Sequence, residues 1–182
     1  MKYLLLFFLL YSSELAFSQS IDKNLVFWSS TKKISIADFA IKTNNKKASS
    51  SFMQFSIDYN VNGFDFLTKN FNKKVRNSFI RTASWIDTTS NVEKSIRYQQ
   101  TLFDISEIYT RKFRKQLKEN RKKIARGTQI VEEINQSIMT EFSKRRIKYD
   151  LDTNFSEIEK SQKEWETQIT IELRELENFA TE

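Results

Sequence analysis

The sequence predicts an α+β domain, with short and mostly antiparallel strands in the first half of the chain and three long helices after them. Between residues 25 and 86, short stretches alternate apolar and polar side chains, which is typical of half-buried strands. From residue 90 onward, apolar side chains recur every three or four residues, which is typical of amphipathic helices. Strands that precede helices in this way favour an α+β arrangement with an antiparallel sheet.

The composition is that of a globular protein with an aromatic core. The chain has 182 residues, of which 39% are apolar and 14% aromatic, and Phe alone occurs 16 times. It contains no Cys, so disulfides, thiolate metal sites and cysteine catalysis are excluded. It also contains no His, which removes the usual general base near neutral pH and the commonest zinc ligand.

Residues 1–18 have the pattern of a secretory signal peptide. Lys2 supplies the positive start, an apolar core follows from Leu4 to Tyr11, and Ala16-Phe17-Ser18 matches a cleavage site. We therefore expect an exported, periplasmic or extracellular protein that begins at Gln19. Residues 19–182 are long enough for one domain, and no later apolar run is long enough to predict a transmembrane segment.

The strands are predicted from the alternating stretches in chain order. The strongest hairpin signal is the alternating run from Phe52 to Asn60, followed by an Asn62-Gly63 turn and a return strand that begins at 64–66. The polar segment 41–51 is predicted to be a loop. Further strands are expected at Leu25–Trp28 and at 75–82.

Three helices are predicted from their start signals and apolar stripes. A Ser90–Glu93 capping box begins the first helix, which is expected to run to about Arg126 and to stop at a left-handed Gly127. Thr128 is expected to cap the second helix, and a capping box at 156–159 is expected to begin the third. The second and third helices carry apolar stripes at Val131, Ile134, Ile138, Phe142 and Tyr149, and at Ile158, Gln162, Trp165, Ile169, Leu173 and Leu176.

The first helix carries the stripe on which the rest of the chain is expected to pack. Its apolar side chains recur at three- and four-residue steps, with Lys and Arg on the other side. This pattern predicts a core-facing helix and, taken alone, indicates no particular chemistry. The residues of the stripe are Tyr98, Leu102, Ile105, Tyr109, Phe113 and Leu117.

The sequence of this helix resembles the metal-site helix of a family of uncharacterised secreted bacterial zinc-dependent peptidases. In that family a His-Glu-x-x-His motif is followed by Phe-Asp-Ile and a Glu-Ile-Tyr-like run, and here 103–105 and 107–109 match those runs. Trp28, the segment 33–39 and the run 149–153 are also similar to the family. The resemblance extends from Trp28 to about Trp165 and implies a zincin-like fold.

The catalytic positions of that family are replaced in this chain. Tyr98 and Leu102 stand where the two His ligands would be, Gln99 stands where the catalytic Glu would be, and Phe155 stands at the position of a third ligand. Leu and Phe have no donor atom, a phenol is a poor zinc ligand at neutral pH, and an amide cannot act as a carboxylate base. We therefore expect no catalytic residue, no metal site and no cofactor.

The function expected from these replacements is that of a non-catalytic binding or structural protein, a pseudo-peptidase. Tyr98, Leu102 and Phe155 are large and mostly apolar, so we expect them to pack together and refill the former metal cavity. Two alternatives remain open at this stage. One is an enzyme that uses a non-zinc mechanism in the old cleft, and the other is a basic helix that binds anionic envelope surfaces.

The basic residues define the candidate surface for that second alternative. Between residues 111 and 126, nine basic residues stand against Glu119 alone, although such runs are most often solvated helix faces. The expected partner is an unknown protein, a peptide or an anionic envelope surface, and export argues against nucleic acid. The predicted surface residues are Arg111, Lys112, Arg114, Lys115, Lys118, Arg121 and Lys122.

Two carboxylates within the first helix require a separate interpretation. Asp104 and Glu107 could help to bind a hard cation. Because they lie on a helix rich in Lys and Arg, we expect them to form ion pairs instead.

Overall fold

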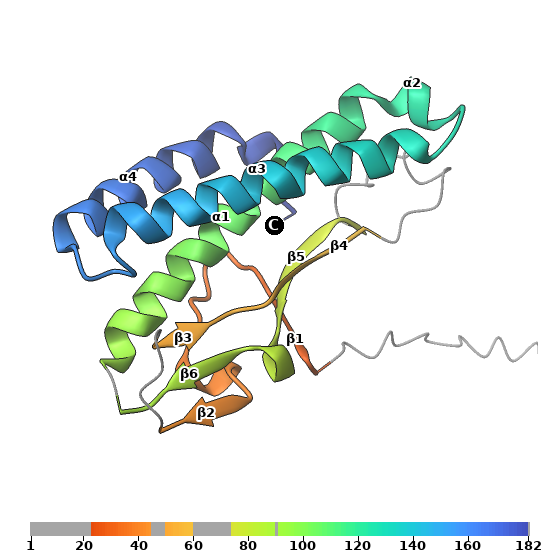
Figure 1. Cartoon of the computed structure of the whole chain (residues 1–182). Coiled ribbons are helices and arrows are strands. Elements are labelled where there is room, and N and C mark those ends of the chain that lie inside the picture. The colour runs from red at the N-terminus through yellow and green to blue at the C-terminus, as the bar shows by residue number, and fades with distance from the viewer. Residues whose placement is uncertain (1–22, 45–49, 60–73, 90, 182) are drawn as a thin grey trace, which may run out of the picture.

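The computed structural model describes residues 23–44, 50–59, 74–89 and 91–181, and within these ranges the predicted α+β class is confirmed. Short strands come first and three long helices follow, and Figure 1 shows the strands on one side of the molecule and the helices on the other. The predicted signal peptide at 1–18, the Asn62-Gly63 turn and the return strand at 64–66 lie outside the described residues.

The strands form two small sheets. In the first, β1 (Leu25–Phe27) and β4 (Phe55–Asp58) both pair antiparallel with the central β5 (Arg76–Ile80). In the second, β6 (Trp85–Asp87) pairs antiparallel with β3 (Ser51–Phe52) and parallel with β2 (Ile41–Thr43). The prediction of mostly antiparallel pairing is therefore confirmed for the described strands.

Two strand predictions were wrong in detail. The predicted strand from Phe52 to Asn60 is divided into β3 and β4, because Met53 is fully buried and the amide of Gln54 donates to the Ser84 hydroxyl at 3.1 Å. The segment predicted to be a loop contains β2, which exists through its parallel pairing with β6. A local pattern cannot reveal a pairing between segments about 40 residues apart.

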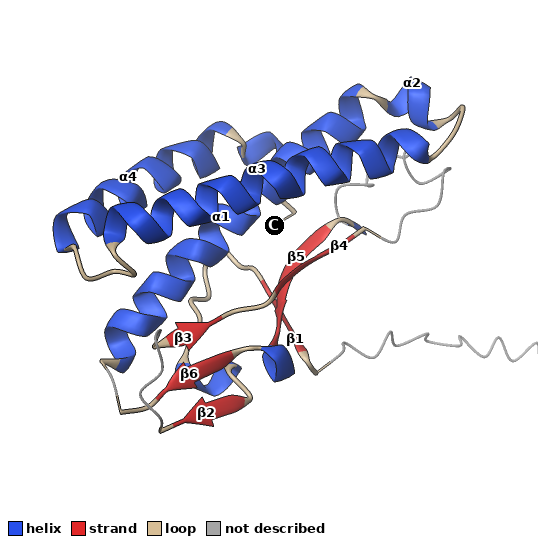
Figure 2. Cartoon of the chain, in the orientation of Figure 1, coloured by secondary structure: helices blue, strands red, loops and turns tan. Residues whose placement is uncertain are grey.

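The helices form a layer around one long central element. Helix α1 (Val92–Glu119) contacts both α3 (Gln129–Thr153) and α4 (Glu159–Glu175), and α2 (Arg121–Ile124) forms the short connection between α1 and α3. Figure 2 shows α1 between the other long helices and the strands. Short 3-10 turns lie at η1 (Ile36–Asp38), η4 (Arg81–Ala83) and η5 (Glu177–Phe179). In the described part of the chain, no helix has the length and apolarity needed to cross a bilayer.

The ends of the first helix differ from the predictions. Asn91, and not the predicted Ser90, is the N-cap residue of α1, and it accepts the Lys94 amide at 3.1 Å. Ser90 itself lies outside the described residues. The long helix is interrupted at Asn120, whose side-chain amide donates to the Gln116 carbonyl at 2.9 Å and competes with the helix backbone. Gly127 does not adopt a left-handed conformation, and a Cβ placed on it would meet no atom within 4 Å.

The starts of the later helices also differ in their capping. Thr128 is the N-cap residue of α3, but its side chain makes no capping hydrogen bond. The predicted capping box at 156–159 is absent as well, because Ile158 precedes α4. The left-handed helix end occurs instead after α3, where Asn154 has φ 47°.

The core lies on both faces of α1. The helix-side cluster contains the whole predicted α1 stripe and joins it to the buried residues of α3 and α4, such as Ile138 and Trp165. Phe103 points to the other side, where its ring lies 5.5 Å from that of Phe79 and belongs to the strand-side cluster. One helix therefore holds the two layers together through opposite faces.

A buried group of three charged residues adds to this connection. Glu107 is 1% exposed, and its Oε1 atom lies 3.0 Å from Arg111 Nε and 2.8 Å from Arg114 Nη1. The expectation that Glu107 forms ion pairs is confirmed. Since Arg111 and Arg114 are both buried, their prediction as parts of an exposed basic surface was wrong.

The two guanidinium groups also bind backbone carbonyls from three other segments. Arg114 donates to the Val75 carbonyl through Nε at 2.9 Å and Nη2 at 2.7 Å, and to the Phe179 carbonyl at 3.0 Å. Arg111 donates to the Leu173 carbonyl at 2.7 Å. Burial lowers the pKa of Arg114, and the neighbouring Glu107 charge opposes this effect.

We expect Glu107→Gln to lower the free energy of unfolding by about 3 kcal/mol, because it leaves two buried guanidinium groups without a countercharge. Urea denaturation at neutral pH measures this loss. Glu141→Gln is the matched control, since Glu141 is exposed and its change should stay below about 0.5 kcal/mol. A loss below about 1 kcal/mol in the Glu107 variant would contradict a stabilising role for the ion pairs.

Candidate functional site

The residues at the positions of the resembled metal ligands come from α1 and from the turn between α3 and α4. Tyr98 and Leu102 lie one helical turn apart, and they are 6% and 0% exposed. The rings of Tyr98 and Phe155 lie 6.3 Å apart, centroid to centroid. Residues separated by more than 50 positions in the sequence therefore meet at this point.

Tyr98 is held by a hydrogen bond and by an aromatic contact. Its hydroxyl donates to the carboxylate of Asp150, and its ring stacks on that of Tyr149 at 5.2 Å and 16°. Burial raises the pKa of the Tyr98 phenol, and the hydrogen bond to the carboxylate raises it further. The side chain is therefore a neutral hydrogen-bond donor at physiological pH, which is the opposite of a phenolate ligand.

A chain of buried polar groups continues from Tyr149 across the helical layer. The Tyr149 hydroxyl donates to Gln162 Oε1 at 2.7 Å, and Gln162 Nε2 donates to Thr101 Oγ1 and to Glu166 Oε1, each at 2.9 Å. Gln162 is fully buried. The sequence analysis placed Gln162 in an apolar stripe without assigning it a role. A polar amide in such a stripe could have indicated a buried side chain with several hydrogen bonds.

Gln99 serves the strand side of α1. Its side chain is 1% exposed, and Nε2 donates to the Ser51 hydroxyl in β3 at 2.9 Å. Its Oε1 atom is buried without a hydrogen-bond partner. The residue at the position of the resembled catalytic Glu thus fastens α1 to the second sheet.

Phe155 differs from the expectation that it is buried as part of a refilled cavity. It is 52% exposed, and it is the middle one of three successive left-handed residues, with Asn154 before it and Ser156 after it. These positive φ angles, 47°, 55° and 71°, reverse the chain direction between α3 and α4. Phe155 therefore lies at the surface against Tyr98, while Tyr98 and Leu102 are buried as expected.

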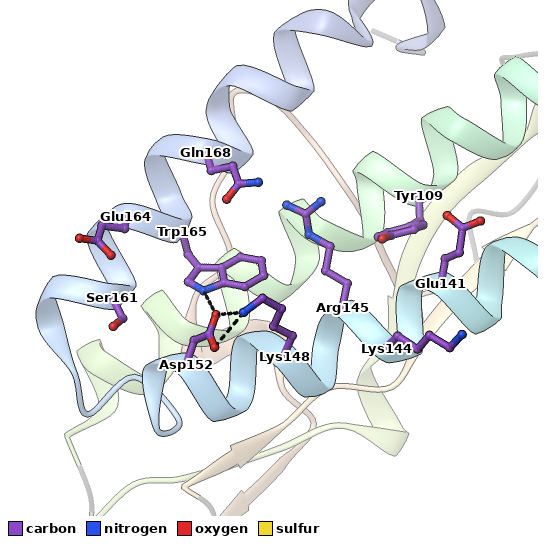
Figure 3. A pocket seen from close by; sticks show the side chains of 10 residues that line it. All are labelled: Tyr109, Glu141, Lys144, Arg145, Lys148, Asp152, Ser161, Glu164, Trp165 and Gln168. Carbon is purple, nitrogen blue, oxygen red and sulfur yellow. Dashed lines mark hydrogen bonds and ion pairs between the residues drawn. The ribbon is translucent and has the colours of Figure 1, made fainter.

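An open groove of about 760 Å³ lies beside this region, between α3 and α4 (Figure 3). Its volume falls within the range of about 300–1,000 Å³ typical of ligand sites. The sequence analysis did not anticipate it, because the gap between two helices depends on their packing angle. The residues lining it are Tyr109, Glu141, Lys144, Arg145, Lys148, Asp152, Ser161, Glu164, Trp165 and Gln168.

The polar groups in the middle of this groove are paired with one another. Asp152 Oδ2 accepts from Trp165 Nε1 at 3.1 Å and from Lys148 Nζ at 2.7 Å, as the dashed lines in Figure 3 show. The hydrogen bond from Lys148 lowers the pKa of Asp152. The Arg145 guanidinium lies 5.2 Å from the Trp165 ring centroid and binds both oxygens of Glu172, at 2.7 and 2.6 Å.

Asp104 is held by two hydrogen bonds and one ion pair. Asp104 accepts from Trp28 Nε1 at 2.7 Å and from Gln100 Nε2 at 2.9 Å, and it lies 3.6 Å from Lys33 Nζ, which confirms the ion pair expected for it. In the described ranges, no three or more His, Cys, Asp or Glu residues are grouped so that they could hold a metal ion.

Comparison of the chain with known protein families, with curated proteins and with solved structures finds no match.

We expect Tyr98→Phe to lower the free energy of unfolding by about 2 kcal/mol at neutral pH, because the half-buried carboxylate of Asp150 loses its hydrogen-bond donor. Burial raises the folded-state pKa of Asp150 above its ordinary 3.8, and the Tyr98 hydrogen bond opposes that rise. Removing the hydroxyl should therefore raise the pKa of Asp150 further. The difference in the free energy of unfolding between the two proteins should have its full size above the pKa of Asp150. It should become smaller as the pH falls through that pKa, because Asp150 is then neutral in both proteins.

Urea denaturation over a pH series measures this effect. Tyr59→Phe is the matched control, because the Tyr59 hydroxyl lies 3.4 Å from the carboxylate of Glu132 in an exposed contact. Its loss should stay below about 0.5 kcal/mol at every pH. An equal loss in the two variants, or a loss in the Tyr98 variant that is independent of pH, would contradict the role given to this hydrogen bond.

Proposed function

We propose that this chain is an exported, non-catalytic binding protein built on a zinc-peptidase-like domain. The proposal is supported by the residues shared with that family, such as the Phe103-Asp104-Ile105 run, and by the replacement of the ligand and base positions. A chain without His or Cys lacks the side chains that most often bind zinc.

The observation that carries the proposal is the bonding of Tyr98. Its hydroxyl donates to Asp150 and its ring stacks on Tyr149, so the one oxygen among the three ligand-type positions is already engaged. Leu102 offers no donor atom and is fully buried. These contacts favour a structural role for residues that would otherwise face a metal.

The groove between α3 and α4 supports the binding role. It combines a large aromatic surface at Trp165 and Tyr109 with charged groups of both signs, which suits a peptide or a polar small molecule. Its side chains come from the three long helices α1, α3 and α4, and such rigid elements hold a binding surface in a constant shape.

Metal analysis and a broad peptide-library assay on the purified protein test the non-catalytic assignment. We expect no stoichiometric zinc and no cleavage, because no ligand set or carboxylate base remains at the positions named above. One zinc ion bound per chain, or cleavage that a chelator abolishes, would refute the assignment.

A variant with restored ligands tests the relation to the peptidase family. It combines Tyr98→His, Gln99→Glu, Leu102→His and Phe155→His. If these positions correspond to a zinc site, the variant should bind one zinc ion per chain, at least about tenfold more tightly than a control with only two converging ligands.

That control carries the same three changes on α1 but replaces Phe155→His by Ile158→His, which is also an exposed residue close to α4. Circular dichroism establishes that both variants fold. Equal zinc affinity in the two folded variants would reject the family relation while leaving the absence of catalysis in the natural chain as a separate result.

A further inference from the structure

The exposed positive charge of the helical layer gathers at one end of it. Arg111 and Arg114 are buried with Glu107, and Lys112 is half-buried, with its Nζ atom 4.6 Å from the centroid of the Tyr109 ring. The exposed basic residues of this segment lie on the last turns of α1, on α2 and in the turn before α3. We call them the basic tip, and Figure 1 shows α2 at the far end of the helical layer. The basic tip consists of Lys115, Lys118, Lys122, Lys123 and Arg126, all of them exposed.

The local structure directs these side chains outward. Helix α2 has one turn, and Ile124 is its buried residue, packed in the same cluster as Val131 of α3. Around this apolar residue, Lys122, Lys123 and Arg126 are exposed. A Cβ placed on the following Gly127 would meet no atom within 4 Å, and Figure 1 shows this turn at the far end of the helical layer.

The basic tip has more cations than there are acidic residues near it in sequence. Glu119 is the single acid between residues 115 and 126. At the start of α3, Glu132 accepts from the Tyr59 hydroxyl at 3.4 Å, and Glu133 accepts from Gln129 at 3.2 Å.

The acids of α4 are engaged elsewhere. Glu159 and Glu166 bind Arg97 at 2.8 and 2.7 Å, and Glu172 binds Arg145. These three acids of α4 are therefore paired with arginines that lie outside the basic run 111–126.

We propose that the basic tip binds the phosphate groups of anionic lipids at a membrane surface. Clusters of about four to eight Lys and Arg residues on a helix are typical of proteins that bind anionic lipids by electrostatic attraction. The apolar residues of the segment, Leu117 and Ile124, are buried, so the contact is electrostatic and does not require insertion into the bilayer. A turn at the end of the helical layer can approach a flat membrane surface, whereas a single strand of nucleic acid is held in a groove.

Lipid head groups explain these features better than nucleic acid does. Single-stranded nucleic acids are held by aromatic side chains on which the bases stack, in addition to positive charge. The segment 115–128 contains no aromatic residue. This inference is independent of the function proposed above, because the basic tip lies on a different part of the helical layer from Tyr98 and from the groove.

Sedimentation with lipid vesicles tests the proposal. The natural protein should sediment with phosphatidylcholine vesicles that contain phosphatidylglycerol, should fail to sediment with phosphatidylcholine alone, and should dissociate as salt rises. The triple variant Lys122→Gln, Lys123→Gln and Arg126→Gln should bind about 100-fold more weakly, because each cation near an anionic bilayer contributes about fivefold.

The matched control removes three exposed lysines far from the basic tip, through Lys32→Gln, Lys42→Gln and Lys160→Gln. It has the same net charge as the basic-tip variant. It should retain binding within about fivefold of the natural protein. Equal losses in the two triple variants, unchanged binding in the basic-tip variant, or binding to neutral vesicles would each overturn the proposal. Tighter binding to a DNA oligonucleotide than to anionic vesicles would overturn the assignment to lipid.

Discussion

The arrangement of the two layers depends on the burial of one carboxylate on α1. A buried charge is costly unless it is paired and hydrogen-bonded, so Glu107 requires the two guanidinium groups that lie one and two turns along the same helix. The guanidinium groups are in turn satisfied only if the carbonyls of Val75, Leu173 and Phe179 are within reach. One charge on α1 therefore sets the positions of β5, α4 and η5 relative to it.

The helical layer is specified by neutral hydrogen bonds as much as by apolar packing. Stacked Tyr98 and Tyr149 fill space between α1 and α3, but their hydroxyl groups must each find an acceptor, which Asp150 and Gln162 provide. Gln162 can satisfy Tyr149, Thr101 and Glu166 together in a single register of α4. Polar groups inside this layer thus select one packing arrangement among several that apolar contacts would allow.

The sequence predicted the features that depend on local periodicity, and it failed where remote partners decide. The α1 stripe from Tyr98 to Leu117 is buried as predicted, because helical spacing alone determines which side chains share a face. Arg114 looked like a surface residue, since the carbonyls that bind it come from residues 75 and 179. For the same reason β2 was missed, and the left-handed helix end was expected at Gly127 although it occurs at Asn154.

The same pairing pattern accounts for the uneven charge of the molecule. The ion pairs of Glu107 withdraw two cations from the surface of α1, and the α4 acids bind Arg97 and Arg145 near the other end of α3 from α2. The short segment 120–128 between α1 and α3 holds four basic residues and no acidic one. A charge distribution of this kind orients a protein before contact, because the end with the higher potential is drawn first toward an anionic surface.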